Sequence, residues 1–304
     1  MGRIVVPGGS GQIGRQLRRL WPEHDIVTVS RSEGVHWDGR TLGPWADEID
    51  GCDAVINLAG RSVGCRYTKN NLREMLTSRV DSTRVVGEAI ARAKKPPRVW
   101  LQMSTATIYA HTYGPPNDEA TGVIGGDEPD VPPYWAFSVD IAKAWEDAMA
   151  AADTPRTRRV ALRTAMVMSR ERGGAFPVLH RMARFGLGGP VAGGRQYLSW
   201  IHELDLVRAF EFLLNHDNIT GPVNLAAPNP LRHKDFMRVL RQVSGMPVGL
   251  PATAWMAEIG AFVLRNDTEL LLKSRRVVPG KLLDSGFTFE FPEWPAAAQD
   301  LVRA

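Results

Sequence analysis

A tyrosine and a lysine that could exchange protons lie in the stretch PYWAFSVDIAKAWEDA, residues 133–148. Tyrosine can act as a general acid or base, and a nearby lysine can lower its pKa for that work. Side chains meet on one face of a helix at separations of three or four residues, whereas Tyr134 and Lys143 are nine residues apart. The spacing therefore disfavours a joint catalytic role, and the two prolines before Tyr134 place that residue in a loop.

A glycine-rich turn in VVPGGSGQIGRQL, residues 5–17, is the strongest motif. Gly8, Gly11 and Gly14 form the pattern GxxGxxG between a β-branched run and an amphipathic stretch. Glycines there allow a tight turn and a close approach of the backbone, and the helix N-terminus offers N–H groups to a diphosphate. The pattern predicts a dinucleotide site whose members are Gly8, Ser10, Gly11, Gln12, Ile13 and Gly14.

The stretch VTVSRS, residues 27–32, indicates which dinucleotide would bind. Folds selective for NAD usually place an acidic residue at the end of the second strand, where it accepts hydrogen bonds from the ribose. Ser30 and Arg31 stand there instead. A guanidinium suits a 2′-phosphate, which it can bind with two donors. The prediction is therefore NADP(H).

The elements that must position these residues alternate between short β-branched runs and longer amphipathic stretches, which is typical of βαβ units. The expected strands are Arg3–Pro7, Asp25–Ser30, Asp53–Ala59, Arg98–Ser104 and Arg159–Val167. The clearest helix is expected over Lys69–Ala93, and a further strand, Gly221–Pro228, is expected to return to the sheet. We predict an α/β fold with a doubly wound parallel sheet. Residues 1–168, joined by 202–227, would form the Rossmann core, and residues 169–304 would form mainly a smaller substrate lobe.

Composition excludes several classes of function. The net charge of +4 is modest, and the basic stretches at 155–163 and 271–281 lack interleaved aromatic residues, so we interpret them as solvated surface rather than a nucleic-acid site. No apolar run is long enough for a membrane span, and the N-terminus shows no signal-peptide pattern. Cys52 and Cys65 suit neither a disulfide framework nor a metal cluster. We expect a cytoplasmic protein without a metal, existing as a monomer or homodimer.

Several motifs together resemble the short-chain dehydrogenase/reductase superfamily in its extended, epimerase-like branch. They are GGSGQIG (8–14), INLAG (56–60), STATIY (104–109) and WIHELDLVRA (200–209). The stretches SRVDSTRVV (78–86) and RRVVPGKLLDSGFTFEFP (275–292) are similar to those of the atypical, YfcH-like group of epimerase-family proteins. The resemblance runs from about residue 3 to the C-terminus.

The resemblance implies roles for residues beyond the glycine loop. Thr105 matches the catalytic hydroxyl residue of the STATIY-type segment. The further residues expected to line the cofactor are Leu58, Ala59 and Gly60 at the end of the third strand, Glu74 and Arg79 on the following helix, and Met103 and Ser104 beside the nicotinamide. For Glu74 an ion pair on the helix surface is an open alternative.

The resemblance also sets the register of the helix that follows Tyr134. The superfamily pattern is YxxxK followed four residues later by glutamate. Aligning it on Glu146 puts Ser138 at the tyrosine position and Ala142 at the lysine position. Both usual catalytic groups would then be absent, and an unassisted serine hydroxyl is too weak an acid to replace tyrosine near neutral pH.

Other proton carriers lie close by in the sequence. They are Tyr109, His111, Tyr113, Asp118 and Glu119 in the loop after STATIY, Asp140 on the helix, and the pair His202 and Asp205. Each also fits an ordinary loop or capping role, so only the geometry of the site can show which of them is catalytic. We take Thr105, Tyr109 and Ser138 as the catalytic candidates.

The expected function is an NADP(H)-dependent oxidoreductase or epimerase-like enzyme acting on a small organic substrate. The alternative is a non-catalytic protein that senses NADP(H) or binds a partner.

Overall fold

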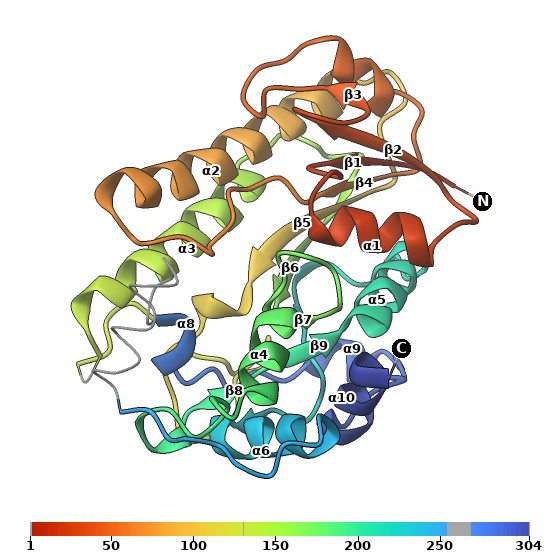
Figure 1. Cartoon of the computed structure of the whole chain (residues 1–304). Coiled ribbons are helices and arrows are strands. Elements are labelled where there is room, and N and C mark those ends of the chain that lie inside the picture. Colours follow the sequence, from red (N-terminus) through yellow and green to blue (C-terminus); the bar gives the residue numbers. More distant parts are fainter. Residues whose placement is uncertain (1, 130, 254–268, 304) are drawn as a thin grey trace.

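A parallel seven-stranded sheet forms the centre of the computed structural model, which describes residues 2–129, 131–253 and 269–303 (Figure 1). Its strands are β1 (Arg3–Pro7), β2 (Asp25–Ser30), β3 (Val35–His36), β4 (Ala54–Asn57), β5 (Val99–Thr105), β6 (Arg158–Thr164) and β10 (Gly221–Leu225). They lie in the order β10-β6-β5-β4-β1-β2-β3, and every neighbouring pair is parallel. The order reverses beside β1, where such sheets bind ligands. The predicted doubly wound α/β fold is confirmed.

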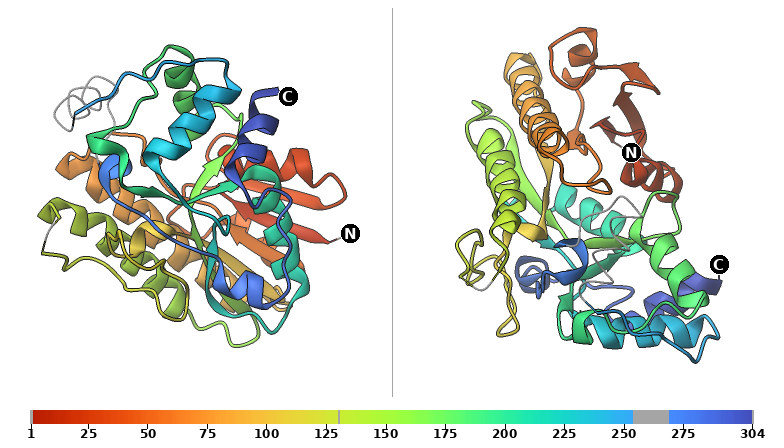
Figure 2. Two further views of the ribbon diagram at one scale, coloured as in Figure 1. Left: turned by 90° about the horizontal axis from the view of Figure 1, so that it is seen from below. Right: turned by 60° about the vertical axis from the view of Figure 1, so that its left-hand side comes forward.

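Helices cover both faces of this sheet. The helices α2 (Lys69–Arg92) and α3 (Ala136–Ala150) run side by side over one face, as the right-hand view of Figure 2 shows. The helices α1 (Gln12–Leu20) and α5 (Glu203–Asn215) pack together over the other face. The predicted helix Lys69–Ala93 agrees with α2 to within one residue, and the Thr68 side chain caps it by accepting from the Asn71 N–H.

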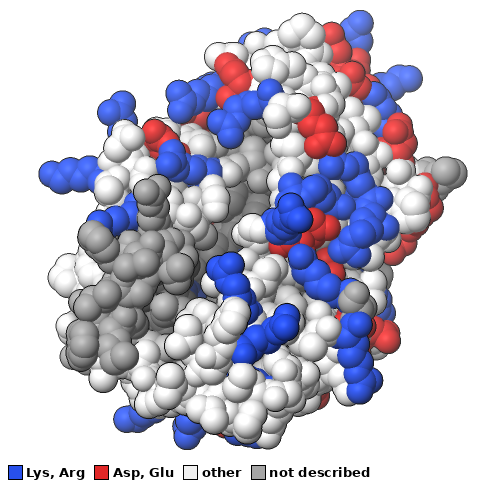
Figure 3. Space-filling model, in the orientation of Figure 1, with Lys and Arg blue, Asp and Glu red and all other residues white. Residues whose placement is uncertain are grey.

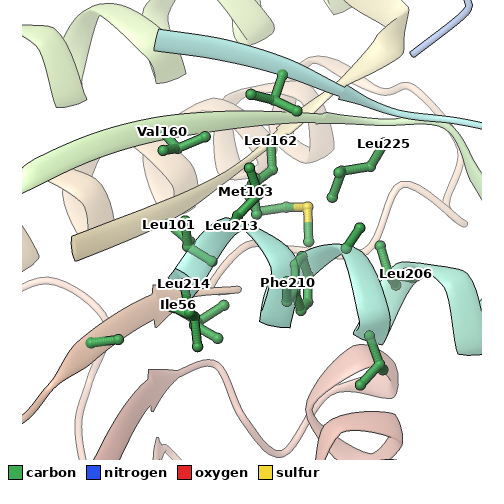
Figure 4. Close-up of a cluster of buried hydrophobic side chains, with 14 of the residues drawn as sticks. Ile56, Leu101, Met103, Val160, Leu162, Leu206, Phe210, Leu213, Leu214 and Leu225 are labelled. Carbon is green, nitrogen blue, oxygen red and sulfur yellow. The ribbon is translucent and has the colours of Figure 1, made fainter. Parts of the chain in front are cut away.

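Alternation along the strands explains the two layers of helices. In β5, Trp100 points to the α2 and α3 side, while its neighbours Val99 and Leu101 point to the α5 side. The cluster on the α5 side includes Ile56, Leu162 and Phe210, which Figure 4 shows meeting between the strands and the helix. All of these side chains are almost fully excluded from solvent. Strands that are apolar on both faces are typical of a buried parallel sheet.

The edges of the sheet are short or interrupted. At one edge β3 has two residues, Val35 and His36. At the other edge β10 pairs only with β6 within the sheet, and it contains Pro222, which has no N–H to donate.

The strand predicted over Arg159–Val167 is two strands. The first, β6, ends at Thr164, and the Ala165 N–H then donates to the Leu225 carbonyl. The chain leaves the sheet here, and β7 (Met166–Met168) pairs instead with β9 (Trp200–His202) outside it. The run of apolar residues continues through this break, so the sequence pattern gave no sign of it.

A smaller lobe lies beside the carboxyl ends of the strands. It contains α4 (Ala175–Arg184), β8 (Tyr197–Leu198), β11 (Leu231–Arg232), α6 (His233–Val243), α8 (Glu269–Leu272), α9 (Gly280–Asp284) and α10 (Trp294–Arg303). Its core is a separate cluster in which the Trp294 ring stacks on Phe236 with centroids 3.9 Å apart. The 3-10 turns are η1 (Pro44–Ile49), η2 (Ala106–Ile108), η3 (Pro133–Trp135) and η4 (Ala192–Gly194). Among the described residues, no helix has the length and apolar character to cross a membrane.

Candidate functional site

The glycine loop joins β1 to α1 at the carboxyl edge of the sheet. Gly8 has a φ of +80°, and a Cβ there would come within 2.6 Å of the Ala59 nitrogen. At Gly14 a Cβ would lie 2.0 Å from the Gly9 carbonyl oxygen. Gly11 differs, because a Cβ there would approach only the Gly8 oxygen, at 3.2 Å. The first and third glycines are therefore required by the fold, whereas the second borders open space in front of the first turn of α1.

Two arginines of α1 donate hydrogen bonds to backbone carbonyls of the glycine loop. Arg18 donates to the Gly9 carbonyl at 2.9 Å and to Thr28 Oγ1 at 2.7 Å, and Arg15 donates to the Ser10 carbonyl at 2.8 Å. The Gln12 side chain turns away from the loop and donates to Ser169 Oγ at 3.0 Å. Figure 3 shows this face hollowed near its centre, with basic side chains, which on α1 are arginines, gathered beside the hollow. Each arginine of α1 also forms an ion pair with a glutamate, Arg15 with Glu171, Arg18 with Glu33 and Arg19 with Glu203. The N–H groups at the start of α1 are therefore the donors that would attract an anionic ligand to the loop.

The two residues predicted to select NADP(H) lie at the end of β2 and behave differently. The Ser30 hydroxyl donates to the Glu33 carbonyl at 2.6 Å and accepts from the Glu33 N–H at 2.8 Å, so it shapes the turn. Arg31, the next residue, is exposed. Of the pair, Arg31 is thus the one with an exposed side chain.

The turn after β4 brings Leu58, Ala59 and Gly60 against the glycine loop and α2. Arg79 of α2 is 8% exposed, and its Cγ would lie 3.3 Å from a Cβ at Gly60. Its guanidinium donates to the Met75 carbonyl and lies 4.8 Å from the Trp145 ring centroid. Burial lowers the pKa of Arg79 to about 10. A buried cation therefore lies under the turn.

Glu74 lies on the more exposed part of α2. Its carboxylate forms an ion pair with Arg61 and accepts a hydrogen bond from Asn70 at 3.1 Å. This is the helix-surface pair that the sequence left open as the alternative to cofactor contact.

A buried polar network lies at the end of β5. Ser104 donates to Glu146 Oε1 at 2.7 Å, and Arg163 grips the same carboxylate through Nε at 2.9 Å and Nη2 at 2.8 Å. Burial opposes the charge of Arg163, but the bonds to Glu146 outweigh it, so the pKa of Arg163 is raised. Thr105 is half-buried and accepts from the Thr107 N–H at 3.2 Å. Met103 accepts from the Thr164 hydroxyl and packs in the core.

Tyr109 belongs to this network rather than to an open cavity. It is 1% exposed, and its hydroxyl accepts from Arg163 Nη1 at 3.0 Å and donates to Asn224 Oδ1 at 2.9 Å. Burial raises the pKa of Tyr109. A phenol enclosed in this way joins β6 to β10, and its placement gives no support to the proton-donor role predicted for it.

Four of the other stand-in residues have structural partners. Asp118 caps the turn to Thr121, and Glu119 accepts from the Asn224 and Lys281 N–H groups. His202 caps α5 by accepting from the Leu204 N–H, which is the capping role that the sequence left open, and Asp205 accepts from the Glu290 N–H.

The pair Tyr134 and Lys143 does not share a face. Tyr134 lies in η3, before α3, and is 48% exposed. Lys143 lies on α3 and points to the loop at Gly126, where a Cβ would be 3.3 Å from its Nζ. Ala142, at the lysine position of the register, is fully buried in a cluster with Ala106 and Ile108 of η2.

The Ser138 hydroxyl is assisted by a residue that sequence reasoning missed. It donates to Glu269 Oε2 at the start of α8, 131 positions later in the chain. One turn further on, Lys273 is 1% exposed, although its basic stretch was interpreted as solvated surface, and this interpretation is wrong for Lys273. The spacing of Glu269 and Lys273 by four residues was the available signal, since it predicts a helical ion pair.

Comparison with known proteins places these motifs in a family. Residues 4–226 match the model described as the NAD dependent epimerase/dehydratase family. The chain belongs to this epimerase family. Residues 252–301 match a second model, described as a domain of unknown function, DUF1731. The family motifs thus extend from the glycine loop to the C-terminal lobe.

Two curated members of the epimerase family match over nearly the whole chain. The epimerase family protein SDR39U1 of Bos taurus is 31% identical over 99% of both chains, and YfhF of Bacillus subtilis is 27% identical over 98% of this chain and 97% of its own. Among solved structures, human SDR39U1 (isoform 2) with NADPH superposes with a TM-score of 0.83 at 28% identity and 98% coverage of both chains. The parallel sheet and its lobe are therefore shared with epimerase-family proteins.

Proposed function

We propose that this protein is an NADP(H)-dependent oxidoreductase or epimerase-like enzyme that acts on a small organic substrate. The observation that carries the proposal is the geometry of the glycine loop. Its first and third glycines are closed against the protein, whereas Gly11 faces space that a diphosphate would fill. NADP(H) would supply or accept the hydride, and the chain's own residues would bind and orient it.

The phosphate preference is assigned to Arg31. It is exposed at the end of β2, where NAD-selective folds carry an acidic residue, and a guanidinium binds a phosphate through charge-assisted bonds. The presence of NADPH in the human relative agrees with this assignment. Arg79 would place its buried charge beneath the turn at Gly60, on the side of the cofactor ribose.

The reacting end of the substrate would lie between Thr105 and Ser138. Thr105 ends β5, and Ser138 occupies the helix position that carries tyrosine in the superfamily pattern. The Ser104, Glu146 and Arg163 network fixes the strand end against α3. One observation supports the alternative, a non-catalytic NADP(H) sensor. Ala142 stands at the lysine position of the superfamily pattern, has no charged group and is fully buried.

The cofactor part is tested by calorimetric titration with NADPH and NADH. Gly11→Val should weaken NADPH binding by at least about 100-fold, or roughly 2.7 kcal/mol, because the side chain enters the diphosphate space. Gly43→Val is the matched control, since a Cβ at Gly43 makes only an ordinary 3.6 Å contact with Trp45. Unchanged NADPH affinity in Gly11→Val would overturn the site.

The catalytic part is tested by following NADPH absorbance with a panel of aldehydes, ketones, imines and enones. Turnover of any member supports the enzyme, and its specificity identifies the reacting group. NADPH binding without turnover or hydride exchange would favour the sensor.

A further inference from the structure

A carboxylate from the C-terminal lobe reaches the position of the missing tyrosine. Glu269 is the first residue of α8, and its side chain is 1% exposed. It accepts the hydrogen bond of Ser138, which stands on α3 at the tyrosine position of the superfamily pattern. The lobe and the Rossmann core therefore meet through one hydroxyl and one carboxylate at the candidate reaction centre.

Two cations compensate the charge of this carboxylate. Lys273 Nζ lies 3.9 Å and Arg275 Nη2 lies 3.6 Å from Glu269 Oε1. A buried carboxylate without such partners would be costly. The same two cations reach the turn after β5, because Lys273 donates to the Thr107 carbonyl at 3.1 Å and Arg275 donates to Thr107 Oγ1 at 3.2 Å. Thr107 is two residues from Thr105, so the cluster connects both catalytic positions.

We propose that Glu269 is the acid–base group of this site and that Ser138 relays the proton between Glu269 and the substrate oxygen. This inference rests on the proposed oxidoreductase function. It removes the objection that a serine hydroxyl is too weak an acid, because the hydroxyl only passes on a proton that the carboxyl group gives or takes. Arg275 is a positioning residue that holds Glu269 and Thr107 together, and Lys273 is the cation with which Glu269 exchanges its proton.

The relay balances in both directions. In carbonyl reduction, the carbonyl carbon receives a hydride with its two electrons from NADPH, and the C=O π bond becomes the lone pair of an alkoxide. Glu269 first receives a proton from the Lys273 ammonium, 3.9 Å from its Oε1. The alkoxide oxygen then takes the Ser138 proton while Ser138 takes the proton of the Glu269 carboxyl group, which leaves a carboxylate and a neutral Lys273 amine. In alcohol oxidation, Ser138 takes the substrate hydroxyl proton and passes its own proton to the Glu269 carboxylate.

The environment of Lys273 suits proton exchange with this carboxylate. Burial is the main cause that lowers the pKa of Lys273 to about 8, and Arg275 lowers it further, while Glu269 and Glu128 raise it. His111, which accepts from the Ser274 N–H at 3.0 Å, faces the same cluster. Lys273 can thus lose or regain a proton close to neutral pH.

The test measures single-turnover hydride transfer from NADPH to 4-nitrobenzaldehyde and to 2,3-butanedione with the full chain. Glu269→Gln keeps an acceptor for Ser138 but cannot carry the proton, and Ser138→Ala removes the relay. Each should slow hydride transfer by about 10²- to 10⁴-fold, the usual contribution of a general acid. The matched control is Glu203→Gln, a buried carboxylate paired with Arg19, which should stay within about threefold of wild type.

Three further readouts separate a relay from a structural contact. NADPH affinity should be unchanged in folded Glu269→Gln, although this variant loses stability because Lys273 and Arg275 keep their buried charge without the carboxylate. Glu269→Asp should recover part of the rate. The solvent isotope effect of wild type should depend non-linearly on the deuterium fraction, because two protons move together, and Ser138→Ala should lose this curvature.

The outcomes are distinguishable. If wild type reduces a probe and Glu269→Gln does so at a similar rate, the relay is wrong while the proposed function stands. If wild type binds NADPH but transfers hydride to neither probe and to no member of the wider panel, the enzyme proposal fails and the relay fails with it.

Discussion

Removing the guanidinium of Arg163 should destabilise the protein more than any surface arginine change. Its bonds to Glu146 are bidentate, and the two side chains are only 10% and 16% exposed. Breaking a buried pair by removing one partner costs about 3–5 kcal/mol, because the other charge stays buried without compensation. Arg163→Met also removes a donor to Tyr109. We expect a loss of at least about 3 kcal/mol of unfolding free energy.

Thermal and urea unfolding measure this loss. At roughly 2–4 °C per kcal/mol for a chain of this size, the unfolding temperature of Arg163→Met should fall by roughly 6–12 °C. The control is Arg98→Met, whose partner Asp217 is 62% exposed, and it should change stability by about 1 kcal/mol or less. Adding Glu146→Gln to Arg163→Met should restore part of the stability, since no charge is then buried alone. A loss below about 1 kcal/mol in Arg163→Met would refute the reasoning.

Three more predictions concern the site and the lobe. Arg31→Asp should weaken NADPH far more than NADH, because a carboxylate repels the 2′-phosphate; equal binding of both cofactors by wild type in calorimetry would contradict the role of Arg31. Tyr134→Phe and Lys143→Met should leave NADPH binding intact and turnover within a fewfold of wild type, and a loss above about a hundredfold in single-turnover assays would show that the register is wrong. His233 is buried, and desolvation lowers its pKa from the ordinary 6.5 to about 4. Its unfolded form therefore binds the proton more readily, so its contribution is complete above pH 6.5 and is lost as the pH falls toward 4. The loss is roughly 3 kcal/mol. In urea unfolding at pH 7 and pH 4, His233→Asn should lose correspondingly less stability than wild type between the two pH values, and equal losses would contradict this prediction.

Local chemistry predicted the first half of the fold well. Strands and helices there can be predicted from the spacing of apolar residues that are close in the sequence. As a result, β1 and β2 begin and end at the predicted residues. The glycine loop could also be predicted, because the tight turn that requires glycine at positions 8 and 14 is a local feature of the chain. The break at Ala165 was not, since it depends on hydrogen bonds to Leu225 and Ser199 that only the folded chain supplies.

The candidate reaction centre shows the same division. Ser138 could be named from its register, but its partner Glu269 is 131 positions away and comes from another lobe. Tyr109 fitted a proton donor by type and position in the sequence, whereas burial between β6 and β10 gave it a structural role. Long-range contacts decide both cases, and a single sequence does not encode them in its spacing.

The way the sheet ends has a consequence for self-association. A long, unpaired strand edge is a template on which a second chain can add its own strand, and this is a common route to aggregation. Here β3 offers two residues, and β10 interrupts its outer edge with Pro222, with α9 packed against it. Neither edge gives an unbroken row of donors and acceptors. Addition of a strand from a second copy of this chain is therefore disfavoured at β3 and at β10.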